Sequence, residues 1–400
     1  MLTVVECVFV GSVAPLGGAL SVATGAQVRQ ECLHRRAYPQ AVVRASSFTS
    51  NSAGEGGGIF AAGSLVVLSC AFSRNSASFE GGALLVTGAS NTTIFGTLFS
   101  NNSALNGGAI AAIEAGTFVA TRVTFDANEA TQDAGGVYVV DGASGELRSC
   151  TFTFNTADEG GALLLSDNAT VSATACVFEN SSAVERGGAV MLEDFAQTTF
   201  ESCNFTGGAA LEGGVLFGED LSFMQVHWCY FASNVAQDDG GVAVKEGVAR
   251  VESTSSIFEF NRAGIDGGAI LVEGNASVVV SSSIFTSNEA AIGEGGGIMV
   301  QEGARLMGSN TTFQGNFARN GAGHVLCQQL ARAVFERSKF IEVLGGGGVS
   351  LQNNCEANFT ECDFEANVAA QNGGAMLLES VFASLVGCKF SRNFAAGLGG

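Results

Sequence analysis

The stretch that decides the fold is Phe99-Ser-Asn-Asn-Ser-Ala-Leu-Asn-Gly-Gly-Ala-Ile110, in which a Phe-x-x-Asn tetrapeptide is followed by a Gly-Gly-Ala-Ile tetrapeptide. Both halves recur along the chain, the glycine pair usually some 8 to 10 residues after the Phe. The copies with Asn three residues after Phe begin at Phe48, Phe72, Phe99, Phe125, Phe152, Phe231, Phe258, Phe285, Phe313, Phe364 and Phe390. A fixed period of this kind is the signature of a repeat protein.

The repeat is too short to be a domain. From Phe48 to Phe390 the anchoring Phe residues are 24 to 28 residues apart. A unit of this size cannot enclose a core, so it must bury its apolar side against its neighbours, as in a solenoid.

The residues within each repeat favour short strands. The segments before each Phe are rich in Val, Ile, Thr and Ser, and glycine pairs or Asn interrupt every apolar run within about ten residues, too soon for typical helices. We therefore predict a right-handed parallel β-helix of about 15 rungs of roughly 26–27 residues, forming one domain over residues 1–400. Equivalent residues should form internal ladders, including an Asn ladder and one buried stack. The predicted stack comprises Phe72, Phe99, Phe125, Phe152, Phe178 and Phe205.

One segment breaks the period. Between Phe9 and Phe48 lie 39 residues, about 13 more than one repeat. The excess contains basic residues, among them Arg35, Arg36 and Arg44. We expect an irregular insertion loop near residues 26–44, either a variable loop near an end or a protrusion on a binding face.

Charge restricts the partners. The net charge of −20 argues against nucleic acid and anionic membranes, because both need a basic face. No run of eighteen apolar residues occurs, so we expect no transmembrane segment in this chain. The first twenty residues are apolar but carry Glu6 and lack a basic start, so they do not read as a signal peptide.

The alternation of Phe-x-x-Asn with Gly-Gly-Ala-Ile-like pairs resembles the passenger repeats of chlamydial polymorphic outer membrane proteins, over nearly the whole chain. The resemblance implies a secreted or surface-displayed β-helix, associated with adhesion and located in the outer membrane if the source is bacterial. An export signal and a membrane anchor are not recognisable, and the sequence stops mid-repeat at Gly399-Gly400. We therefore expect a fragment of a longer protein, whose partner is an unidentified cell-surface protein or glycan.

The alternative is a carbohydrate-active β-helix enzyme, a polysaccharide lyase or hydrolase with a pectate-lyase-like fold. Gln237-Asp238-Asp239, Gly323-His324 and Arg337-Ser338-Lys339 follow the order of polygalacturonase motifs. However, Asp239 and His324 lie three repeats apart, roughly 14 Å at strand spacing, which exceeds the reach of paired catalytic groups. We therefore expect no enzyme and no catalytic residue. A cleft of non-repeating Asp, Arg and Lys on neighbouring rungs would favour the enzyme.

Acidic residues recur at two places in the repeat. The first row precedes the glycine pair and comprises Glu55, Glu80, Asp133, Glu159, Glu185, Glu212, Asp239, Asp266 and Glu294. The second row follows Phe by 14 to 17 residues and comprises Glu114, Asp141, Asp167, Glu193, Glu219, Glu246, Glu273, Glu302 and Glu379. They are either solvated corners or weak Ca²⁺ sites. The candidate ligands are Asp133, Glu159, Glu185, Glu212, Asp239 and Asp266; otherwise no metal and no cofactor is expected.

Two cysteines interrupt the second acidic row. Cys327 follows Phe313 by fourteen residues, and Cys355 follows Phe340 by fifteen. Stacked rungs hold equivalent Cα atoms about 5 Å apart, within the range of a disulfide. We predict a Cys327–Cys355 disulfide at an open corner, whereas the inward cysteines two residues before Phe, such as Cys150 and Cys176, stay reduced.

Overall fold

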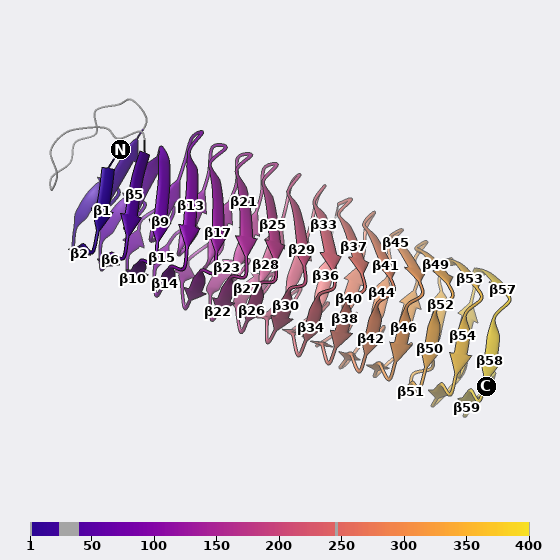
Figure 1. Ribbon diagram of the computed structural model, residues 1–400. Coiled ribbons are helices and arrows are strands. Elements are labelled where there is room, and N and C mark those ends of the chain that lie inside the picture. The colour runs from indigo at the N-terminus through magenta and orange to yellow at the C-terminus, as the bar shows by residue number, and fades with distance from the viewer. Residues whose placement is uncertain (1, 24–39, 245–246, 400) are drawn as a thin grey trace. The chain divides into compact units, whose positions relative to one another are not determined.

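The computed structural model describes residues 2–23, 40–244 and 247–399, which form parallel β-strands. The chain divides into two compact units, Met1–Thr198 (unit 1) and Thr199–Gly400 (unit 2), and the division falls within β29 (Gln197–Glu201). In each unit the strands of successive coils stack into sheets that we name A, B, C and D in chain order (Figure 1).

Unit 1 contains four stacks of strands. Sheet A comprises β1 (Leu2–Val5), β5 (Gln40–Arg44), β9 (Ser64–Leu68), β13 (Asn91–Phe95), β17 (Thr117–Thr121), β21 (Ser144–Arg148) and β25 (Thr170–Thr174). Sheet B comprises β2 (Val8–Val10), β6 (Ser47–Thr49), β10 (Ala71–Ser73), β14 (Leu98–Ser100), β18 (Thr124–Asp126), β22 (Thr151–Thr153) and β26 (Val177–Glu179). Sheet C comprises β3 (Val13–Leu16), β7 (Ser52–Glu55), β11 (Ser76–Ala77), β15 (Ser103–Ala104), β19 (Glu129–Ala130), β23 (Thr156–Glu159) and β27 (Ser182–Arg186). Sheet D comprises β4 (Leu20–Ala23), β8 (Ile59–Ala62), β12 (Leu84–Val86), β16 (Ile110–Ala112), β20 (Val137–Val139), β24 (Leu163–Leu165) and β28 (Val190–Leu192).

Unit 2 repeats this plan. Sheet A comprises β33 (Phe223–His227), β37 (Arg250–Thr254), β41 (Ser277–Ser281), β45 (Arg305–Ser309), β49 (Arg332–Glu336), β53 (Glu356–Thr360) and β57 (Phe382–Val386). Sheet B comprises β30 (Asn204–Thr206), β34 (Tyr230–Ala232), β38 (Ile257–Glu259), β42 (Ile284–Thr286), β46 (Thr312–Gln314), β50 (Lys339–Ile341), β54 (Asp363–Glu365) and β58 (Lys389–Ser391). Sheet C comprises β31 (Ala209–Ala210), β35 (Val235–Ala236), β39 (Arg262–Ala263), β43 (Glu289–Ala290) and β47 (Phe317–Ala318), and a short sheet comprises β51 (Leu344–Gly345), β55 (Val368–Ala369) and β59 (Phe394–Ala395). Sheet D comprises β32 (Leu216–Gly218), β36 (Val242–Val244), β40 (Ile270–Val272), β44 (Ile298–Val300), β48 (Val325–Cys327), β52 (Val349–Gln352) and β56 (Met376–Glu379).

The anchoring Phe residues form the predicted stack within each unit. In unit 1, Phe99 lies 4.8 Å from Phe72 and 5.4 Å from Phe125 between ring centroids, and all three rings are buried. Phe205 stacks on Phe231 in unit 2 at 4.8 Å. Burial of aromatic rings in parallel stacks supplies much of the apolar core.

The Asn ladder is also confirmed. Asn102 donates from its side-chain Nδ2 to Oδ1 of Asn128 at 2.9 Å, and its backbone N–H donates to the same oxygen at 3.0 Å. Each amide thereby satisfies buried backbone and side-chain groups of neighbouring coils, which would otherwise be destabilising.

The glycine pair serves two purposes at the corner that leads into sheet D. Gly107 adopts φ +66°, which glycine tolerates without strain, and a Cβ on Gly108 would collide with the carbonyl oxygen of Glu129 in the next coil. Ala134 takes the left-handed position in one coil, at φ 56°.

The predicted insertion ends earlier than residue 44. Residues 40–44 form β5, because Ala41 and Val43 turn into the core while their neighbours face outward. Residues 24–39, which include Arg35 and Arg36, lie outside the described residues.

Candidate functional site

The predicted disulfide is present, but not at the expected place. Cys327 and Cys355 are bonded, with Cα atoms 5.8 Å apart. Cys327 lies in register with Leu351 rather than with Cys355, and both cysteines are buried rather than at an open corner. The equivalence predicted by counting from Phe is wrong, because the coil that begins at Phe340 is shorter than its neighbours.

Cys355 instead takes the place of a small buried residue. Its backbone N–H donates to the Gln352 carbonyl, as Ala331 does to Gln328 one coil earlier. These bonds close the turn between sheets D and A, whose two central residues, Asn353 and Asn354, have φ 51° and 64°. The bond therefore runs diagonally, from the end of β48 to the residue before β53. Cysteines of the inward row, including Cys150 and Cys176, are free and buried.

The first acidic row is not continuous in unit 1. Asn106 and Arg186 occupy two of its positions, so the predicted member Glu185 is wrong by one residue and is exposed. Arg186 donates from Nε to Oε1 of Glu159 at 2.8 Å. A positive and a neutral residue within the row reduce repulsion between stacked carboxylates.

Half-burial of this row disfavours ionisation. Burial, followed by the charge of Glu159, raises the pKa of Asp133 to about 6. Burial also raises the pKa of Glu80, with a smaller contribution from Glu55. These carboxyl groups pack against the corner, and their raised pKa values follow from that position.

In unit 2 the same row has a structural role. Asp239 accepts the backbone N–H of Asp266 through Oδ1 at 3.0 Å, and Asp266 accepts that of Glu294 at 2.7 Å. Burial raises the pKa of Asp266 and of Glu294. Among the described residues, no group of three or more His, Cys, Asp or Glu side chains has an arrangement that could hold a metal ion.

The second acidic row combines two different positions. Glu114, Asp141 and Glu302 have φ between 51° and 56° within the turn between sheets D and A, whereas Glu193 and Glu273 lie one residue earlier and accept the closing bond through their carbonyls. Counting from Phe merged them because loop lengths vary. Asp tolerates the left-handed conformation comparatively well, which accounts for part of the row.

His324 is buried away from any substrate. Its Nδ1 faces Nδ2 of Asn316 at 3.2 Å, and its Nε2 faces the carbonyl of Ile341 at 3.1 Å. Burial lowers its pKa to about 3, so the ring is neutral. The resemblance to a polygalacturonase motif is therefore not supported at this residue.

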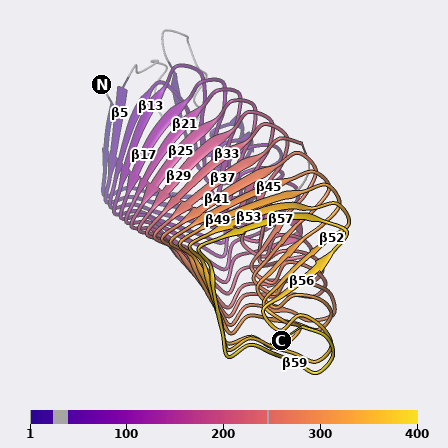
Figure 2. The same cartoon turned by 90° about the vertical axis from the view of Figure 1, so that its right-hand side faces the viewer.

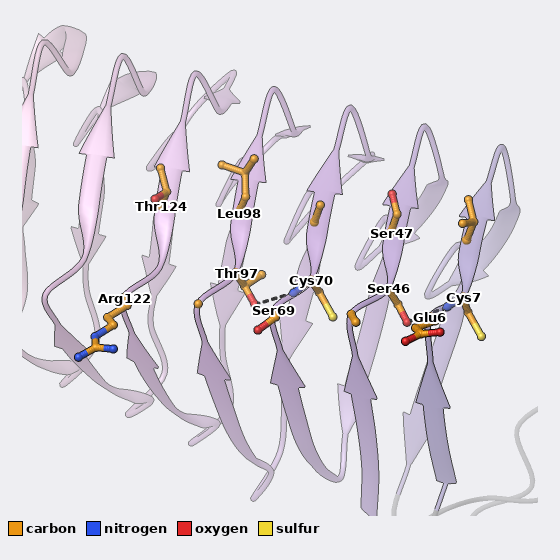
Figure 3. A pocket seen from close by; sticks show the side chains of 14 residues that line it. Glu6, Cys7, Ser46, Ser47, Ser69, Cys70, Thr97, Leu98, Arg122 and Thr124 are labelled. Carbon is orange, nitrogen blue, oxygen red and sulfur yellow. Dashed lines mark hydrogen bonds between the residues drawn. The ribbon is translucent and has the colours of Figure 1, made fainter.

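Two grooves lie on the surface of the units. The unit 1 groove, of about 520 Å³, follows the corner between sheets A and B and includes Ser69, Thr97 and Arg122 (Figure 3). Its polar groups already bond within the fold, since the Cys70 backbone N–H donates to Oγ1 of Thr97 at 3.3 Å. Small side chains line it, and little there is free to recognise a ligand.

The unit 2 groove has stronger chemistry. It encloses about 430 Å³ on the outer face of sheet A, and its lining includes Arg250, Arg305 and Arg332. Register places all three arginines in one row with Ser277, across β37, β41, β45 and β49. Sequence reasoning missed this row, although each arginine follows its Phe anchor by 19 or 20 residues and an alignment of the repeats would have shown it.

The family model described as right handed beta helix region matches residues 32–205 and 254–399. No curated protein matches the sequence significantly. No helix among the described residues is long and apolar enough to cross a membrane.

Proposed function

Because the chain belongs to the right-handed β-helix family, we propose that it is a non-catalytic surface or secreted scaffold that acts in adhesion or another cell-surface interaction. The fold is shared by surface proteins and carbohydrate-active enzymes, so the argument must come from the residues.

The observation that carries the proposal is that the chemically suggestive residues are used by the fold. His324 bonds to Asn316 and the Ile341 carbonyl, and Asp239 accepts a backbone N–H of the next coil. A general acid or base must instead reach the reacting atoms of a substrate.

Two further features support display outside the cell. The Cys327–Cys355 bond suits an oxidising compartment, where disulfides persist. The resemblance of the repeats to passengers of polymorphic outer membrane proteins agrees with a role at a cell surface.

The test has a catalytic and a binding arm. We expect no product release from polygalacturonate, pectate or alginate, measured by reducing ends and by absorbance of unsaturated products, while beads coated with the full chain attach to host cells. Turnover that is abolished by Asp239→Ala but retained in the exposed-site control Glu129→Ala would refute the proposal, and so would attachment no greater than that of uncoated beads.

A carbohydrate-active enzyme is the second candidate, because the unit 2 groove holds non-repeating charged residues on neighbouring coils. The carboxylates beside it are Glu252 on β37 and Glu356 on β53. They lie four strands apart, roughly 19 Å at strand spacing, whereas paired carboxylates of glycosidases lie at most about 9.5 Å apart. This geometry favours binding over hydrolysis at the groove.

A further inference from the structure

The row of arginines in unit 2 carries uncompensated positive charge. Arg305 and Arg332 are directly opposite each other on β45 and β49, and like charges in that arrangement are destabilising. Arg332 has a partner, Glu356, at 3.6 Å, and Arg250 pairs with Glu252. Within the part of the chain that the structure describes, Arg305 has no carboxylate at ion-pair distance. An anion above Arg305 and Arg332 would relieve their repulsion.

Ser277 makes room for that anion. It separates Arg250 from Arg305 in the row, so two guanidinium groups flank a small, half-buried hydroxyl residue. Arg250 and Arg305 are two strands apart, roughly 10 Å at strand spacing. The ring of Phe223 lies 5.6 Å from the guanidinium carbon of Arg250 and supports that side chain at the end of the row.

An apolar strip runs beside the arginines. Val279, Met307 and Val334 occupy the next outward position on the same three strands, β41, β45 and β49, and Met307 is 50% exposed. The face formed by β37 to β53 is open along the stacking direction within unit 2 (Figure 2). The groove therefore pairs a charged row with an apolar row, and both run across the strands.

We propose that this groove binds a linear acidic polysaccharide, with its carboxylate or sulfate groups on Arg250, Arg305 and Arg332 and its ring faces against Val279, Met307 and Val334. Guanidinium groups bind such anions through two parallel hydrogen bonds. A peptide fits less well, because β41 and β45 are paired on both sides and offer no free edge to an added strand. The inference rests on the proposed function, since it names the ligand of a binding scaffold.

The experiment measures binding of fluorescent oligosaccharides to the full chain by anisotropy at about 0.05 M and about 0.5 M salt, because exposed ion pairs weaken with ionic strength. The probes are oligogalacturonate, a heparin oligosaccharide, neutral dextran and oligoglutamate. We expect an acidic oligosaccharide to bind in preference to dextran and oligoglutamate. Arg305→Gln should weaken it roughly tenfold or more, by loss of charged hydrogen bonds.

The matched control is Arg262→Gln. Arg262 is an exposed arginine of unit 2 that pairs with Glu289 on sheet C, outside the groove. Ser277→Glu, which places a negative charge between the arginines, should abolish binding while circular dichroism and melting temperature stay unchanged. Equal losses in Arg305→Gln and Arg262→Gln, no binding of either acidic oligosaccharide, or tighter binding of oligoglutamate would overturn the inference. Cleavage of a bound oligosaccharide would instead overturn only the non-catalytic function and leave the groove assignment intact.

Discussion

His324 and Val343 are two exceptions to the repeat that compensate each other. Val343 stands where the other coils have Asn, three residues after Phe340, so Nδ2 of Asn316 lacks its usual acceptor in the next coil. His324, which replaces the Ala of the Gly-Gly-Ala motif, supplies Nδ1 to that amide and bonds to the Ile341 carbonyl. The imidazole thus replaces one rung of the Asn ladder.

We predict that His324→Ala lowers the free energy of unfolding by about 2–4 kcal/mol, because it opens a cavity and leaves buried polar groups unsatisfied. Adding Val343→Asn should recover part of the loss by restoring the ladder. Urea unfolding of the two variants measures both effects. A double variant no more stable than His324→Ala would show that the ring does not replace the Asn rung.

Asp133 gives a pH dependence of defined sign. Burial, followed by the charge of Glu159, raises its pKa to about 6 from a model value of 3.8. Between these values the folded state binds more protons than the unfolded state, so this contribution to stability is complete below pH 3.8 and is lost as the pH rises through 6.

Asp133→Asn should therefore stabilise unit 1 at pH 7, on the order of 1 kcal/mol after allowance for solvent screening, and have no effect near pH 3.5. Asn106, at the same position one coil earlier, shows that the corner accepts an amide. Urea unfolding at the two pH values is the measurement, with Glu129→Gln as the exposed control. An equal effect at both pH values would contradict the assignment.

At the scale of the strand and its neighbours, stability depends on which side a ring faces. Phe125 is buried between Phe99 and Phe152, at 5.4 and 4.4 Å between centroids. Phe154 is 57% exposed and has φ 54°, a conformation that a bulky residue rarely adopts.

Phe125→Ala should lower the free energy of unfolding by about 3–5 kcal/mol, because it leaves a cavity in the stack. Phe154→Asn should change it by less than about 0.5 kcal/mol, since the ring is exposed and Asn tolerates the left-handed conformation. Chemical denaturation of both variants tests the register. Similar losses for the two variants would mean that the stack contributes little beyond general apolarity.

The same contrast explains what the sequence could predict. Phe, Asn and the glycine pair recur in most coils because each satisfies a requirement of the coil itself, so their ladders follow from the period. Features found in one or two coils were misplaced or missed. Counting from Phe340 misaligned Cys355 because that coil is short, and Glu185 was assigned a position that Arg186 occupies. The arginine row escaped notice because its members skip a coil at Ser277.

For the whole molecule, the repeat makes interactions local. In a solenoid each coil contacts only its neighbours, so a change in one coil should affect the nearest coils most. The Cys327–Cys355 bond offers a test, since it closes a loop of 28 residues between adjacent coils of unit 2. In the chain-entropy account a loop of that length contributes about 3–4 kcal/mol.

Replacement of both cysteines by serine should therefore accelerate amide hydrogen exchange in β48, β52 and β53 and leave exchange in unit 1 unchanged. The contrast arises because the cross-link restricts the unfolded chain only between its two ends. The matched control is Cys150→Ser, at a free, buried cysteine of unit 1, which should accelerate exchange around β21 and β22 only. Peptide mapping of the non-reduced native protein should recover the segments containing Cys327 and Cys355 as one species. Faster exchange throughout unit 1 in the double serine variant would show that the coils unfold as one cooperative block, contrary to the local behaviour expected of this fold.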